Sequence, residues 1–105
     1  MLEVHKDNFE AEVLGASGLV VVDFWSPNCE KCLALMPDME ALEGKYQGQV
    51  KFAKLNIQGN RRLALSLGVR GLPAMGFFKG GQKVALLTPE EVSPEAVEAK
   101  IRELL

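Results

Sequence analysis

The chain is organised around the stretch Phe24-Trp25-Ser26-Pro27-Asn28-Cys29-Glu30-Lys31-Cys32, which follows an apolar strand-like run and opens a helix-like segment. This stretch holds both cysteines of the chain. Positions i and i+3 of a helix are neighbours, so two thiols with this spacing share one face of the first turn and can close a small disulfide ring. The free N–H groups and the positive dipole end of the helix N-terminus favour a thiolate at the first cysteine. Cys29 is therefore a candidate nucleophile.

The cysteine pair suits redox chemistry better than metal binding. A Cys-x-x-Cys next to a strand-helix-strand pattern is typical of a redox motif in a cytosolic protein. A zinc site needs four ligands, whereas this chain offers two cysteines and one histidine, His5. We therefore expect no metal, the alternative being a dimer that pools four thiols. His5 is expected to be a solvated residue near the N-terminus.

Length and composition are those of one globular domain. The chain has 105 residues, enough for one substantial core and too few for two, so a single domain over residues 1–105 is expected. The net charge of −2 and the lack of a basic run give no reason to expect nucleic acid or membrane as a partner. The charged start lacks the apolar stretch of a signal peptide, and no apolar run reaches the roughly 20 residues that span a bilayer. We expect a cytoplasmic protein, although a mature chain stripped of its leader would look the same.

Apolar patterning predicts alternating strands and helices. The continuous β-branched and aromatic run at 19–25 is typical of a central strand covered on both faces. The other expected elements are a strand at 2–5, a helix capped by Asp7 or Asn8 with Phe9 and Val13 on one face, a helix from the cysteines to Gly48, a strand at 50–57, a helix at 61–67, strands at 74–78 and 83–87, and a helix that begins at Ser93. The order β-α-β-α-β-α-β-β-α predicts an α/β fold with a mixed central sheet and helices on both faces.

Six segments resemble thioredoxin in identity and spacing, and they span nearly the whole chain. They are Val22-Asp23-Phe24-Trp25, Cys29-x-x-Cys32, Pro37, Ala53-Lys54-Leu55-Asn56-Ile57, Gly71-Leu72-Pro73 and Phe78-Lys79-Gly80-Gly81. One Cys-x-x-Cys is weak evidence, but six segments in register are strong. The resemblance implies the thioredoxin fold and a thiol-disulfide oxidoreductase that reduces disulfides in target proteins.

The resemblance also implies distinct jobs for the two cysteines. Cys29 attacks a target disulfide to form a mixed disulfide, and Cys32 resolves it, which leaves the pair oxidised. Exchange of this kind proceeds through a thiolate and a mixed disulfide, so a second thiol within reach frees the enzyme. We expect disulfide-containing target proteins as partners, a separate thioredoxin reductase as electron donor, no bound cofactor, and a monomer.

Asp23 is expected to serve Cys32. A carboxylate near the end of an otherwise apolar strand is costly unless it is paired or protonated. We expect burial to raise the pKa of Asp23 so that it takes the proton of Cys32 through a water molecule, as the resemblance implies. A structural pair with Lys54 is the alternative, and the two interpretations are compatible.

The loop before the strand at 74–78 is the expected substrate side. Only about 5% of X-Pro bonds in folded proteins are cis, so the sequence alone predicts a trans bond at Leu72-Pro73, whereas the resemblance implies cis. The implied role of Pro73 is to face the cysteines while the backbone of Leu72 pairs with an extended target segment. Gly71 and Gly81 are expected to leave room for that segment. Trp25 is either a core aromatic or a wall of the site, and the resemblance implies both.

Three arginines lie near this loop in the sequence. Arg61 and Arg62 are expected to form a solvated helix face. Arg70 is closer to the loop, and contact with partners is an alternative to simple solvation there.

The chain departs from the usual thioredoxin pattern around its cysteines. Thioredoxins usually have Gly-Pro between the cysteines and Trp before the first, whereas this chain has Glu30-Lys31 and Asn28. Glu30 repels a nearby thiolate and Lys31 attracts one, so their effects partly cancel. The loss of Pro also frees the backbone of the turn, and the loss of Trp removes apolar contact surface. We therefore predict an altered reduction potential and narrower or altered partners. A disulfide oxidase or isomerase, and a redox-idle binding module, are the alternatives.

Overall fold

A computed structural model describes all 105 residues, and its centre is one five-stranded sheet. The strands lie in the order β1-β3-β2-β4-β5. Strand β3 pairs in parallel with β1 and β2, whereas β4 pairs antiparallel with β2 and β5. The strands are β1 (Leu2–Val4), β2 (Leu19–Trp25), β3 (Val50–Asn56), β4 (Ala74–Lys79) and β5 (Gln82–Leu87). The predicted mixed α/β sheet is confirmed.

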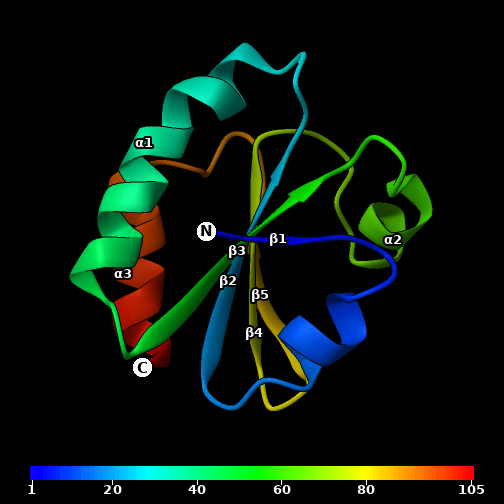
Figure 1. Cartoon of the computed structure of the whole chain (residues 1–105). Coiled ribbons are helices and arrows are strands. Elements are labelled where there is room, and N and C mark those ends of the chain that lie inside the picture. Colours follow the sequence, from blue (N-terminus) through cyan, green and yellow to red (C-terminus); the bar gives the residue numbers. More distant parts are fainter.

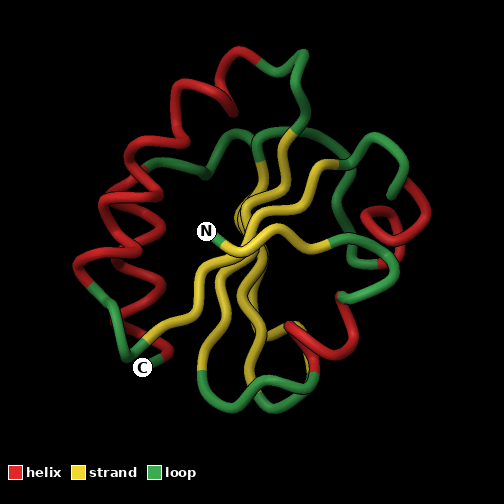
Figure 2. Tube along the Cα trace, in the orientation of Figure 1, coloured by secondary structure: helices red, strands yellow, loops and turns green.

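Helices cover both faces of this sheet. The helices α1 (Glu30–Lys45) and α3 (Pro94–Leu104) lie on one face, and α2 (Arg61–Ser66) and the π-helical segment η1 (Glu10–Leu14) lie on the other (Figure 1). Figure 2 shows the strands as one twisted layer between these two helical layers. No helix is both long and apolar enough to cross a membrane.

Strand β2 lies at the centre of the core, and its first six residues are buried. Successive side chains of a strand point to opposite faces. Val20 and Val22 accordingly join the apolar cluster under η1 and α2, whereas Leu19 and Val21 join the cluster under α1 and α3. By the same alternation, Asp23 faces the α1 layer, where the cysteines begin the helix.

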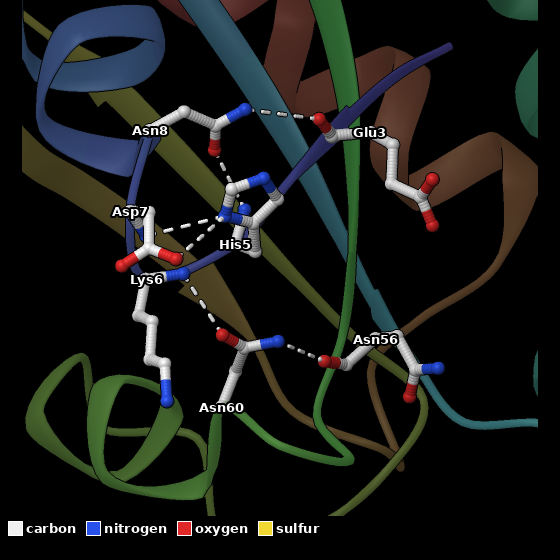
Figure 3. A network of polar contacts seen from close by, with 7 residues as sticks. All are labelled: Glu3, His5, Lys6, Asp7, Asn8, Asn56 and Asn60. Carbon is white, nitrogen blue, oxygen red and sulfur yellow. Dashed lines mark hydrogen bonds and ion pairs between the residues drawn. The ribbon is translucent and has the colours of Figure 1, made fainter.

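The predicted N-terminal helix is wrong in its type and its cap. Segment η1 is a π-helix that follows Phe9, and no side chain caps it. The Asn8 side chain instead accepts a hydrogen bond from the N–H of His5 at 2.7 Å and donates one to the carbonyl of Glu3 at 3.3 Å (Figure 3). The Asn8 side chain therefore closes the turn after β1. Its oxygen accepts the hydrogen bond from His5 and does not cap η1. Phe9 is buried, in agreement with the predicted apolar face.

The other elements start and end within a few residues of the predicted positions. Helix α3 begins as expected, because the Oγ of Ser93 accepts a hydrogen bond from the N–H of Ala96 at 3.0 Å. Helix α1 ends at Lys45 rather than at Gly48, which has a φ of 84° in the turn before β3. Helix ends fray, so local sequence fixes them less sharply than the core faces.

Candidate active site

The two cysteines form a disulfide at the start of α1, with their Cα atoms 5.2 Å apart. Cys29 is the N-cap residue, and its Sγ accepts a hydrogen bond from the N–H of Cys32 at 3.1 Å. Cys29 is half-buried, whereas Cys32 is fully buried. After reduction, the helix N-terminus favours a thiolate at the N-cap position. Only Cys29 is therefore placed to meet a partner directly.

Asp23 is a buried carboxyl group without a partner. It is 1% exposed, and neither of its carboxyl oxygens makes a hydrogen bond. Burial raises the pKa of Asp23 from 3.8 to about 7, and the charge of Lys54 acts in the opposite direction. A carboxyl group with this pKa can accept and return a proton near neutral pH.

Lys54 lies directly opposite Asp23 in the register of β2 and β3, so both side chains start from the same face of the sheet. No hydrogen bond or ion pair joins them. The Nζ of Lys54 instead lies 5.7 Å from the centroid of the Trp25 ring. The expected pairing of Asp23 with Lys54 is therefore not a direct salt bridge, and the charge of Lys54 acts on Asp23 without a hydrogen bond between them.

Trp25 ends β2 directly before the loop that carries the cysteines. Its side chain is half-buried, and its indole Nε1 is buried without a hydrogen-bond partner. One part of the ring thus packs in the protein while another part borders the exposed surface, and the role of Trp25 as a wall of the site stays a prediction.

The loop before β4 lies against the first turns of α1. The Leu72–Pro73 bond is cis, as the resemblance implied. Pro73 is buried and lines a hollow together with Lys31 and Leu35 of α1. The backbone of Leu72 lies outside the helices and strands, and no turn or loop hydrogen bond involves it. The structure thus brings Pro73 and the cysteine-bearing turn to one place.

The structure separates the two glycines assigned to the substrate side. A Cβ added to Gly71 would lie 3.2 Å from the Cγ of Pro89, which lines the hollow beside Pro73. Gly81 is in the turn between β4 and β5, and a Cβ there would lie 3.4 Å from the carbonyl oxygen of Leu14. Strand β4 runs for six residues, about 20 Å, from Pro73 before it reaches this turn. The prediction that Gly81 leaves room for a target at the site is wrong; its φ of 81° suits the tight turn.

Pro89 and Val92 line the same hollow as Pro73, although no sequence motif pointed to them. Both follow β5, the second strand of an antiparallel hairpin. A hairpin returns the chain to the end of the sheet at which it began, so residues after β5 come back to the end at which Pro73 leads into β4. This topological rule would have found them.

The positions at which the chain departs from the usual thioredoxin pattern are all exposed. Asn28, Glu30 and Lys31 surround the half-buried Cys29, and all three are open to solvent. None of their side chains makes a hydrogen bond or an ion pair within the chain. No group of three His, Cys, Asp or Glu side chains is placed to hold a metal ion.

Comparison with known proteins agrees with this geometry. A family model described as Thioredoxin matches residues 1–103. The thioredoxin of Peptoclostridium acidaminophilum is 48% identical over 101 residues, which cover 96% of this chain and 92% of the relative. The thioredoxin of Acetoanaerobium sticklandii is 47% identical over 105 residues, the full length of both chains. Thioredoxin 1 of a Nostoc species is 36% identical over 85 residues, which cover 81% of this chain and 79% of the relative.

Proposed function

The chain belongs to the thioredoxin family and is a thiol-disulfide oxidoreductase, and from this premise we propose that it reduces disulfides in target proteins. The asymmetry of the cysteine pair carries the proposal. Cys29 is half-buried at a helix N-terminus, and Cys32 is buried one turn further on. An accessible thiolate and a protected second thiol are what two-step exchange requires.

The reaction begins at Cys29. Its thiolate forms a bond to one sulfur of the target disulfide, the target S–S bond breaks, and the second target sulfur leaves as a thiolate and takes a proton from solvent. Asp23 then accepts the proton of Cys32, whose thiolate attacks the sulfur of Cys29. The first target sulfur leaves with its electron pair and is protonated in turn. Two electrons have passed to the target, and the protein holds the Cys29–Cys32 disulfide.

Burial, isolation and titration range support Asp23 as this base. Its side chain faces the α1 layer, has no hydrogen-bond partner, and has a pKa of about 7. Near neutral pH the group is therefore divided between its two protonation states. Lys54 assists by favouring the ionised form, which is the form that can accept a proton.

We place the target segment along Gly71, Leu72 and Pro73. The backbone of Leu72 is free to pair with an extended chain, in the manner of strand addition. Trp25 and Asn28 border the site on the side of the cysteine loop, where a docked protein meets the exposed Asn28 amide. The target would thus lie between the cis-proline loop and the start of α1.

The exposed residues around Cys29 lead us to propose a reduction potential and a partner range that differ from those of an ordinary thioredoxin. Glu30 and Lys31 have no internal partners, and they replace the usual Gly-Pro, so the backbone freedom of the turn differs from that of an ordinary thioredoxin as well as the charges beside the thiolate. Equilibration with a glutathione redox buffer measures the potential. A value within error of the roughly −270 mV typical of thioredoxin would contradict this part of the proposal.

The wider setting of the protein is also part of the proposal. We propose that it acts as a monomer in the cytoplasm, without a bound cofactor, and that a separate thioredoxin reductase returns the electrons. A cysteine pair in a reducing compartment is more often catalytic than structural.

Reduction of insulin by a dithiol reductant tests the function. The protein should accelerate the appearance of turbidity, and Cys29→Ser should abolish the acceleration, because serine cannot supply the attacking thiolate. A matched control is Ser66→Ala, an exposed change on α2 that should leave the rate intact. If the unchanged protein did not accelerate turbidity and Cys29→Ser made no difference, the thiols would be idle and the chain a binding module.

A further inference from the structure

A small apolar pocket lies between α2 and the loop that leads to β4. Its volume is about 130 Å³, and most of its lining is hydrophobic. Ile57, Leu65 and Leu72 contribute apolar walls, and Arg61 and Arg70 contribute the charged ones. Leu65 is 54% exposed, so part of this apolar surface is open to water.

The pocket borders the path proposed for the target. The N–H of Ile57 donates a hydrogen bond to the carbonyl of Trp25 at 2.9 Å, which ties one wall of the pocket to the cysteine side of the site. Leu72, in another wall, is joined by the cis bond to Pro73. A chain lying along the loop would therefore pass the mouth of the pocket.

The two arginines of the pocket are free to meet a partner. Both Arg61 and Arg70 are exposed, and neither makes a hydrogen bond or an ion pair within the chain. Residues 45–89 contain no Asp or Glu, yet they carry eight of the twelve Lys and Arg residues. The next acidic residues, Glu90 and Glu91, do not line the pocket. Lys45 and Lys51 of this segment pair with Glu98 and Glu12, whereas Arg61 and Arg70 pair with no carboxylate of the chain.

Helix α2 presents Arg61 from a fixed position. Asn60, which directly precedes it, accepts a hydrogen bond from the N–H of Lys6 at 2.8 Å and donates one to the carbonyl of Asn56 at 2.9 Å (Figure 3). The start of α2 is thereby tied both to the segment after β1 and to the end of β3. Lys6 and Arg62 add two more positive charges around this helix start.

We propose that this pocket selects targets with an acidic segment next to the disulfide, binding an apolar side chain of the target while Arg61 and Arg70 bind its carboxylates. The inference rests on the proposed function, because it names the targets of the same site. A guanidinium group matches a carboxylate in shape and can bind it with two parallel hydrogen bonds. The apolar walls contribute contact area with the target side chain. The charges of the arginines discriminate between acidic and neutral targets.

Two synthetic peptide disulfides test the inference. Both carry a leucine beside the cysteine, and they differ only in two glutamates that are replaced by glutamines in the second peptide. We expect the reduced protein to react about tenfold faster with the glutamate peptide at an ionic strength of about 0.01 M, and this preference to shrink near about 1 M, where screening shortens to about 3 Å. Equal rate constants for the two peptides at low salt would overturn the inference.

Charge reversal locates the effect. Arg61→Glu and Arg70→Glu should each lower the ratio of the two rate constants by about fivefold. Arg62→Glu is the matched control, because it makes the same change in the same helix without lining the pocket, and it should lower the ratio by less than about twofold. Thermal unfolding checks that each variant is folded. An equal loss in Arg62→Glu would show a general field effect and overturn the role of the pocket.

The unchanged protein separates this inference from the function beneath it. It should reduce bis(2-hydroxyethyl) disulfide, which is small and uncharged, whatever the pocket prefers. Reduction of this compound without a preference between the peptides would overturn only the inference, whereas failure to reduce any disulfide would overturn the proposed function. If charge reversal at Arg61 changed the oligomeric state instead of the peptide ratio, the surface would be an interface between copies and the inference would be wrong.

Discussion

The inner half of the site, formed by Asp23, Cys32 and Pro73, is buried, whereas the outer half, formed by Asn28, Glu30 and Lys31, is open to solvent. A charge in the inner half acts through a medium of low polarity, so it changes protonation energies by kilocalories. A charge in the outer half acts through water and changes them by tenths of a kilocalorie per mole. The inner half agrees with the thioredoxin pattern, and the outer half departs from it. We infer that the buried half determines the exchange reaction, whereas the exposed half determines the choice of partner and makes small adjustments to the reduction potential.

The largest expected effect is on stability, from replacing the buried acid. The pKa of Asp23 is about 7 in the folded protein and 3.8 for the free side chain, so burial favours the protonated form. The stability that the folded protein gains from holding Asp23 protonated is fully present below about pH 4. It is lost as the pH rises to about 7. Asp23→Asn, which is never ionised, should therefore raise the free energy of unfolding by about 2–4 kcal/mol near pH 8. Urea unfolding of the oxidised protein as a function of pH measures this.

Asp38→Asn is the matched control, since Asp38 is exposed on α1. Its unfolding free energy should follow that of the unchanged protein at every pH. If Asp23→Asn left both the free energy of unfolding and its pH dependence unchanged, Asp23 would not lie in a region of low polarity.

The second effect is on the resolving step. Asp23→Asn should slow the release of target from the mixed disulfide by roughly ten- to a hundredfold near pH 7, because Cys32 loses its proton acceptor. The attack by Cys29 should change much less. Acid quenching of a single turnover, followed by separation of the mixed disulfide, resolves the two steps. The difference should fade well below pH 7, where Asp23 is itself protonated; a constant ratio over the whole range would argue against a base.

A third and smaller effect tests whether the charge of Lys54 lowers the pKa of Asp23. Lys54→Met keeps most of the side-chain length beside Trp25 but removes the charge that lowers the pKa of Asp23. The pKa of Asp23 should rise, and the free energy of unfolding near pH 8 should fall by about 1 kcal/mol. Carbon NMR of the carboxyl group and urea unfolding measure the two quantities. Lys54→Arg should restore both, and a variant without either change would limit Lys54 to packing against Trp25.

The smallest effect is expected in the outer half. Glu30→Gln removes a negative charge near the Cys29 thiolate, so it should stabilise the reduced protein and raise the reduction potential by about 10 mV. Lys31→Gln should lower the potential by a similar amount. Glutathione equilibration measures both. Shifts of more than about 60 mV would mean that the exposed residues, rather than the buried ones, govern the chemistry. That result would contradict the division of roles between the two halves.

Features governed by local sequence were predictable. Strand β2 covers the predicted residues 19–25, because a continuous run of β-branched and aromatic residues is typical of a strand that is buried on both faces. The start of α3 follows from Ser93 and Pro94, whose capping and backbone preferences act within one turn. Burial of Asp23 followed from one acid in an apolar strand. The cis bond at Pro73 came from family resemblance alone.

Features governed by distant contacts were not predictable in the same way. The error over Gly81 came from the motif match, because the turn that follows β4 lies at the opposite end of that strand from Pro73. The cap expected from Asn8 failed because its amide is engaged by the segment after β1. The path of Lys54 toward Trp25 depends on side-chain packing between strands, which the register alone does not fix.

Trapping a target with Cys32→Ser tests the central claim most directly. Without the resolving thiol, the exchange should stop at the mixed disulfide, and mass spectrometry should find a covalent adduct through Cys29 that a dithiol reductant releases. Cys29→Ser, the matched control, should form no such adduct, because Cys32 is buried. The opposite pattern, with an adduct through Cys32 and none through Cys29, would contradict the account.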